Sequence, residues 1–193
     1  EDAGHVRVYE YSDGGWVQLG SDIDGEAAGD ESGESISLSS DGTIVAIGAM
    51  YNDGNGDGAG HVRVYEYSGG EWVQLGSDID GEVENDFSGE NVSISSDGTI
   101  VAIGATFNDG NDNLSGHVRV YEYSGGDWVQ LGSDIDGEAE GDYSGKVSIS
   151  SDGTIVAIGA NQNVGNGDNA GHVRVDSLDG NLPYTGPAWH VAG

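Results

Sequence analysis

The chain has 193 residues and carries 35 Asp and Glu against 5 Lys and Arg, which gives a formal net charge of −30. A chain this acidic repels nucleic-acid phosphates and anionic lipid surfaces, so we expect no nucleic-acid partner. It has no cysteine, which excludes disulfides and thiolate chemistry, and no apolar run long enough to insert into a membrane.

The chain is built from an internal repeat. The motif Gly-His-Val-Arg-Val begins at Gly4, Gly60, Gly116 and Gly171, at steps of 56, 56 and 55 residues. A period of this length is typical of propellers and other repeat arrays. We therefore predict a single repeat domain over residues 1–193, with a half unit at 1–33, full units at 34–89 and 90–144, and a degenerate last unit at 145–193.

The first predicted element is a β-hairpin over residues 4–20. Val6 and Val8 alternate with polar or aromatic neighbours, and a Trp-Val-Gln-Leu run returns after a glycine-containing turn. Alternation of this kind is typical of a strand with one buried face. We call this element the GHVRV hairpin, and we expect copies after Gly60, Gly116 and Gly171.

Next in chain order comes a second kind of hairpin, the SSDGT hairpin, which turns at Asp41-Gly42. An Asp-Gly dipeptide between alternating runs is a strong hairpin signal, and it recurs at Asp97-Gly98 and Asp152-Gly153. The strand after each turn is apolar on both faces, which predicts a fully buried strand. The residues expected to be buried are Ile44, Val45 and Ile47, with their copies Ile100, Val101, Ile103, Ile155, Val156 and Ile158.

The two hairpins alternate, so each unit holds four short strands and no helical periodicity. This pattern is typical of a propeller blade. It predicts an all-β fold of tandem four-stranded repeats, a β-propeller or propeller-like array with about three and a half blades in this chain. Closed propellers have at least about four blades. We therefore expect that the chain is a fragment of a larger ring, or that neighbouring chains complete its open ends.

The repeated pattern resembles the FG-GAP repeat of integrin-like β-propellers. The similarity covers residues 1 to about 175 and is carried by Ala-Ile-Gly-Ala, which stands where the family has Val-Gly-Ala-Pro, and by Trp-x-Gln. The resemblance implies a propeller of a secreted or cell-surface protein. The family's Phe-Gly is replaced by Ser32-Gly33, Ser88-Gly89 and Ser144-Gly145, and its calcium loop by Ser-Ser-Asp-Gly-Thr. The calcium site of the family therefore does not carry over.

Two other loops in each unit are rich in the oxygen ligands that a hard cation such as calcium prefers. One is the run Asp-x-Asp-Gly-Glu, and the other is a loop of Asn, Asp and Gly. The candidate ligands are Asp22, Asp24, Glu26, Asp78, Asp80, Glu82, Asp134, Asp136 and Glu138 in the first kind, and Asp53, Asp57, Asp109, Asp112 and Asp168 in the second. The alternative is that these residues form solvated turns, which favour Asp, Asn and Gly anyway.

Each GHVRV motif also places one His and one Arg on the same strand face. A ring of such residues around a channel would bind an anionic sugar. Its members would be Arg7, Arg63, Arg119, Arg174, His61 and His117. We favour a structural role, in which each Arg pairs with a loop Asp and packs on Tyr or Trp, because packing against identical neighbours requires the same side chain in every unit. For that reason we also expect Trp16, Trp72 and Trp128 in the core between blades.

Nearly every polar residue is repeated, and no nucleophile–base motif is present, so we expect the protein to have no enzymatic activity. One function left open is an extracellular or cell-surface adhesion propeller with cation-stabilised acidic loops and a glycan or protein ligand. The alternative is a structural subunit of a surface filament or sheath that assembles head to tail. Self-association would then place the Gly4–Gly20 hairpin against the Gly171–Gly193 segment of a neighbouring chain, where Trp189 and Val191 offer an altered strand.

We interpret Leu182–Gly186, which matches the L-P-x-T-G cell-wall sorting pattern, as a chance match because no basic tail follows it.

Overall fold

The structure is a computed structural model that describes residues 3–165 and 167–178. These residues form strands and no helix, as the sequence predicts, and so none of them forms a helix with the length and apolarity needed to cross a membrane. The segments 182–186 and 189–191, which figured in the assembly and sorting hypotheses, lie outside the described residues. The strands are β1 (His5–Ser12), β2 (Gly15–Asp24), β3 (Ser35–Leu38), β4 (Ile44–Ala49), β5 (His61–Ser68), β6 (Glu71–Gln74), β7 (Ile79–Asp80), β8 (Asn91–Ile94), β9 (Ile100–Ala105), β10 (His117–Ser124), β11 (Asp127–Gln130), β12 (Ile135–Asp136), β13 (Ser144–Ile149), β14 (Ile155–Ala160) and β15 (His172–Ser177).

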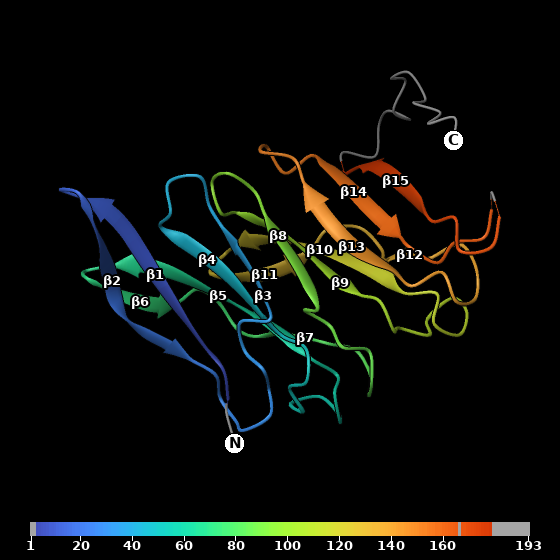
Figure 1. The fold of residues 1–193 in the computed structure, drawn as a ribbon, viewed down its shortest axis with the longest axis horizontal. Coiled ribbons are helices and arrows are strands. Elements are labelled where there is room, and N and C mark those ends of the chain that lie inside the picture. Colours follow the sequence, from blue (N-terminus) through green and yellow to red (C-terminus); the bar gives the residue numbers. More distant parts are fainter. Residues whose placement is uncertain (1–2, 166, 179–193) are drawn as a thin grey trace.

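The described strands form antiparallel sheets that follow one another along the chain (Figure 1). β1 pairs with β2 alone. The next sheet has the order β3-β4-β5-β6, with β7 also paired to β5, and the third repeats it as β8-β9-β10-β11, with β12 paired to β10. The last described sheet is β13-β14-β15. Each full sheet thus joins one SSDGT hairpin to the GHVRV hairpin that follows it. The chain is an all-β, propeller-like array, which confirms the predicted fold class.

The Asp-Gly hairpins are confirmed, but their turns are longer than a two-residue loop. Five residues connect β8 to β9, and among them Gly98 takes the left-handed conformation with φ at 74°. The Asp97 carboxylate accepts hydrogen bonds from the Ser95 hydroxyl at 2.7 Å and from the Thr99 N–H at 3.1 Å. These bonds hold the pKa of Asp97 below its ordinary value. The Asp therefore fixes the turn by accepting hydrogen bonds, while only the Gly needs a positive φ.

Successive sheets pack against each other through backbone as well as side chains. The Ser35 hydroxyl of β3 accepts a 3.0 Å hydrogen bond from the Val92 N–H of β8. A β-carbon added to Gly98 would lie 2.4 Å from the Cδ1 atom of Ile44, so the turn of one sheet sits directly on the preceding sheet. The register between neighbouring units is therefore fixed at the inner strands and at the turns.

Burial of the apolar strand is confirmed for its central positions and corrected at its first position. Val45, Ile47 and their copies are buried. Ile44 and Ile100 are only partly buried, and Ile155 is exposed. The reason is that the turn of the following unit covers Ile44 and Ile100, whereas no such turn from the described residues covers Ile155.

The tryptophans lie between sheets at two junctions. Trp72 Nε1 donates a 2.8 Å hydrogen bond to the backbone oxygen of Leu19, and Trp128 makes the equivalent bond with Leu75. Trp16 is exposed, so the prediction that it belongs to the core is wrong. The described residues place no further sheet against its face of β2.

Candidate functional site

The junctions between units hold the Arg of the GHVRV motif. Arg119 Nη2 donates a 2.8 Å hydrogen bond to the backbone oxygen of Asp80, the last residue of β7 in the preceding unit. Arg174 Nη2 donates one of 2.6 Å to the backbone oxygen of Asp136, the last residue of β12. Arg63 lies 3.5 Å from the carboxylate of Glu26 in the loop before it. These guanidinium groups therefore supply positive charge to the acidic loops of their neighbours.

Arg7 makes a different contact. Its guanidinium binds Asp22 of the same hairpin at 2.7 Å, and the Gln18 amide donates to the other oxygen of that carboxylate at 2.8 Å. The hydrogen bonds from Arg7 and Gln18 lower the pKa of Asp22 to about 2. Asp22 is thus an ion-pair partner, although the sequence suggested it as a metal ligand.

The motif histidines at 61 and 117 are buried beside these arginines. Arg63 Nε donates to His61 Nε2 at 3.4 Å, which places the proton of a neutral imidazole on Nδ1, and Nδ1 faces the Asp78 carboxylate at 3.7 Å. His117 Nδ1 lies 3.9 Å from both Glu82 and Asp134. Burial, followed by the neighbouring guanidinium, lowers the pKa of both histidines. Both causes favour the neutral form of the two imidazoles.

The carboxylates of the Asp-x-Asp-Gly-Glu runs do not come together as the sequence suggested. Among the described residues, the side chains that could jointly hold a metal ion are Glu26, His61 and Asp78, and again Glu82, His117 and Asp134. Each group thus combines residues of two successive units. Calcium prefers oxygen ligands, whereas each group contains an imidazole and has a guanidinium beside it. These groups do not fit calcium.

The remaining members of these runs lie apart from the two groups. Asp24, Asp80 and Asp136 stand opposite the motif histidines in the strand pairing, and Glu138 lies 3.4 Å from His172.

The second kind of acidic loop is exposed at one end of the sheets. Asp53 accepts a 2.8 Å hydrogen bond from the Gly58 N–H, and Asp109 accepts one of 2.7 Å from the Leu114 N–H, so each carboxylate ties its own loop together. Asp57, Asp112 and Asp168 are exposed to solvent. A cation bound here would need backbone oxygens and water to complete its coordination.

One repeated acidic residue was not identified as a functional candidate from the sequence. Asp86 is buried, and one of its carboxylate oxygens accepts hydrogen bonds from the Asn108 amide at 3.0 Å and from the Val83 N–H at 3.2 Å. The same contacts recur for Asp30 with Asn52 and for Asp142 with Asn163. The available signal was the fixed spacing of these aspartates along the chain. Each of them looks like an ordinary turn residue, because the sequence alone does not show its Asn partner.

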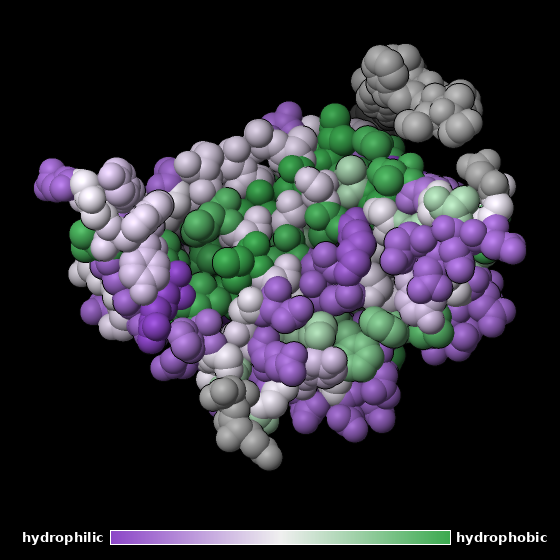
Figure 2. All heavy atoms as spheres, viewed as in Figure 1, coloured by the Kyte–Doolittle hydropathy of each residue, from purple (hydrophilic) through white to green (hydrophobic). Residues whose placement is uncertain are grey.

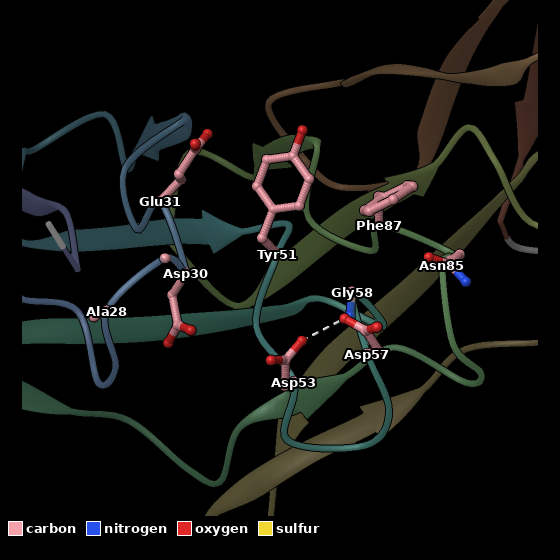
Figure 3. A pocket seen from close by; sticks show the side chains of 10 residues that line it. Ala28, Asp30, Glu31, Tyr51, Asp53, Asp57, Gly58, Asn85 and Phe87 are labelled. Carbon is pink, nitrogen blue, oxygen red and sulfur yellow. Dashed lines mark hydrogen bonds between the residues drawn. The ribbon is translucent and has the colours of Figure 1, made fainter. Parts of the chain in front are cut away.

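A hollow of about 470 Å³ lies where the loops of successive units meet (Figure 3). The carboxylates of Asp53 and Asp57 line it, and so do the rings of Tyr51 and Phe87, whose centroids are 5.3 Å apart in an edge-to-face arrangement. Asp30, Glu31 and Asn85 also contribute to the lining. Asp53 and Asp57 are candidate ligands predicted from the sequence, whereas the two rings are not. The signal for the rings was that these positions change from one unit to the next.

No family model matches the chain, and no curated protein matches it. The FG-GAP resemblance therefore rests on the motifs alone. Solved structures similar to the chain include TolB from Acinetobacter baumannii, at 13% identity and a TM-score of 0.48, covering 92% of this chain and 39% of that one. The putative TolB from Agrobacterium tumefaciens matches at 15% identity and a TM-score of 0.49, covering 91% of this chain and 56% of that one. The chain thus spans less than two thirds of either protein, and nothing about ligand or activity transfers at this level of similarity.

Proposed function

We propose that this chain is a non-enzymatic, extracellular repeat protein whose propeller binds a glycan or protein ligand through the loops at one end of its sheets. The proposal is supported by a contrast within each unit. The His and Arg of the junctions are the same in every unit, whereas the loops at 27–31 and 50–58 differ from their copies. In repeat proteins, differences between units concentrate on loops of one face, which is often the binding face.

A role in adhesion follows from the motif resemblance to FG-GAP propellers, which implies a secreted or surface protein. The absence of enzymatic activity is inferred from the repetition itself, because catalysis usually needs one unique constellation of groups. The titratable groups gathered at the junctions are duplicated in successive units and are bound to one another.

The exposed acidic loops are further proposed to take up divalent cations. A net charge of −30 destabilises the compact state by self-repulsion. A ligand that binds only the folded protein adds stability by mass action. Calcium should therefore raise the melting temperature more than sodium chloride at the same ionic strength. Equal shifts would indicate screening alone and would leave the binding function without its cation component.

The binding function is tested by presenting the purified chain to arrays of neutral, amino and anionic glycans and of peptides. We expect saturable binding to at least one class. The double variant Met50→Asn/Tyr51→Gln, which introduces the residues found at 161 and 162, should weaken that binding while the melting temperature stays within a few degrees, because it keeps Asp53 and Gly58, which hold the loop together. A chain that binds no ligand saturably on any array would contradict the proposal.

The structural alternative is favoured by one specific observation. Ile36 and Leu38 of β3 are 53% and 47% exposed, whereas their copies Val92 and Ile94 in β8 are 8% and 7% exposed, because β3 packs on them. Figure 2 shows the apolar atoms gathered over this part of the sheets. A subunit that assembles head to tail would cover this face with another unit of the same kind. Sedimentation over a range of concentrations tests it: polymers support the alternative, and a constant monomeric mass contradicts it.

A further inference from the structure

The hollow at the end of the sheets combines negative charge with aromatic surface. Glu31, Asp53 and Asp57 are exposed carboxylates that line it. Phe87 packs directly on the backbone of Gly58, where an added β-carbon would lie 2.8 Å from the ring. The loops that carry these groups lie together at the lower edge of Figure 1. The volume of the hollow, about 470 Å³, falls within the range of ligand pockets, roughly 300–1,000 Å³.

The rings belong to a row that crosses two junctions. Phe87 contacts Tyr51 on one side and Phe107 on the other, the second pair at 5.2 Å, and Phe107 contacts Tyr143 at 5.5 Å. Phe87 and Tyr143 have φ of 53° and 51°. Bulky residues are uncommon in this left-handed region, and such outliers cluster at binding sites. The equivalent Glu31 has the same φ of 53°, so this conformation is a feature of the repeat at this position, and Phe87 and Tyr143 present their rings from it.

The equivalent positions at the next junction carry less negative charge. The ring pair is kept there as Phe107 and Tyr143, whose centroids are 5.5 Å apart. Of the three exposed carboxylates only Asp109 remains, because Phe87 and Asn113 stand where the first hollow has Glu31 and Asp57. Leu114 also replaces Gly58. The combination of several carboxylates with two rings therefore occurs at the first hollow, and near-identical units have become different at this place.

We propose that the first hollow binds a lysine side chain of a protein partner. The carboxylates attract the ammonium group, the rings stabilise it by cation–π contact, and the alkyl stem lies against the apolar surface of the rings. The net charge of the chain steers basic segments toward it. The inference rests on the proposed binding function and names the chemistry of the partner.

The test measures the affinity of a fluorescent tetralysine peptide by anisotropy, at physiological ionic strength and with EDTA present so that divalent cations do not compete. The double variant Glu31→Gln/Asp57→Asn should weaken binding about tenfold, and Tyr51→Leu about threefold. The matched control is Glu66→Gln/Glu122→Gln, which removes the same charge from exposed positions of β5 and β10. We expect that control to bind as the parent does, and all variants to keep its melting temperature.

Equal loss of affinity in the two double variants would reduce the effect to general charge attraction and overturn the site. Unchanged binding by Tyr51→Leu would overturn the cation–π contact and with it the proposed pocket. A peptide with all lysines acetylated should not bind, and binding by it would contradict recognition of the ammonium group. If the chain binds an array glycan but not tetralysine, this inference fails and the binding function stands. If it binds nothing, both fail.

Discussion

The indole Nε1 of Trp128 donates a 2.7 Å hydrogen bond to the backbone oxygen of Leu75, fifty-three residues earlier in the chain. Trp72 makes the same bond with Leu19. One side chain thus joins two successive sheets, because it fills the space between them and also satisfies a carbonyl that the junction removes from water. Trp16 has the same sequence environment but is 70% exposed.

We expect Trp128→Phe to lower the free energy of unfolding by about 2 kcal/mol, because it removes apolar volume and leaves the Leu75 carbonyl without its partner. Trp16→Phe is the matched control, and its effect should stay within about 0.5 kcal/mol. Urea unfolding monitored by circular dichroism measures both. Equal effects of the two substitutions would contradict the role of Trp128 in joining the sheets.

This contrast between identical tryptophans shows what could be predicted from the sequence. Strand pairing within a hairpin is local, and the repeat period places it correctly, so the hairpins at Asp41-Gly42 and Asp97-Gly98 were predictable. The environment of a side chain at a junction depends on which other unit packs there. The same motif residue is therefore buried at 128 and exposed at 16, and no property of the motif distinguishes them.

The candidate site was predictable to a smaller extent. The sequence placed Asp22, Asp24 and Glu26 in one ligand set because they alternate along the chain. The structure separates them, since Arg7 binds Asp22 while Glu26 reaches the next unit. The buried Asp86 was missed because its partner Asn108 lies twenty-two residues away. Alternation along one segment cannot reveal contacts that the packing of units creates.

Both hydrogen bonds to Asp86 go to the same carboxylate oxygen. We therefore expect Asp86→Asn, which keeps one acceptor oxygen, to cost less than about 1 kcal/mol, and Asp86→Ala to cost about 2–3 kcal/mol because the Asn108 amide and the Val83 N–H lose their acceptor. Chemical denaturation measures both values. A loss with Asp86→Asn as large as with Asp86→Ala would show that the negative charge itself is needed.

The buried histidines predict a dependence of stability on pH. Because burial lowers the pKa of His61 and His117 in the folded chain, the unfolded chain binds more protons near and below its ordinary histidine pKa of about 6.5. Stability from these residues is therefore present above that pH and is lost as the pH falls below it. The charged groups around the first imidazole are Arg63, Asp78, Glu26 and Asp80. Those around the second are Arg119, Asp134, Glu82 and Asp86.

The measurement is the free energy of unfolding between pH 8 and about 5.5, where the carboxylates stay mostly ionised. The double variant His61→Gln/His117→Gln should show a flatter dependence than the parent, even if it is less stable overall. His5→Gln, at an exposed position, serves as the control and should keep the slope of the parent. A double variant with the slope of the parent would show that neither histidine is responsible.

The glycine of the Ala-Ile-Gly-Ala strand provides the last prediction. A β-carbon at Gly104 would lie 1.9 Å from the backbone oxygen of Gly145 in the next unit, and one at Gly48 would lie 2.0 Å from that of Gly89. Backbone cannot yield as a flexible side chain does, so the two sheets would have to move apart. We expect Gly104→Ala to cost about 3 kcal/mol or more, beyond the usual range for overpacking, through loss of the packing between β9 and β13.

Gly159 is the matched control, because it occupies the same place in β14. Among the described residues, an added β-carbon there would meet only the Lys146 side chain and backbone, at 3.4 and 3.7 Å. These are ordinary contacts, and the substitution also reduces the freedom of the unfolded chain, so Gly159→Ala should be neutral or stabilising by up to about 1 kcal/mol. Thermal and urea unfolding of the two single variants give the comparison directly. If Gly104→Ala were as stable as Gly159→Ala, the backbone of the following unit could not lie against β9, and the face-to-face packing of the units would have to be wrong.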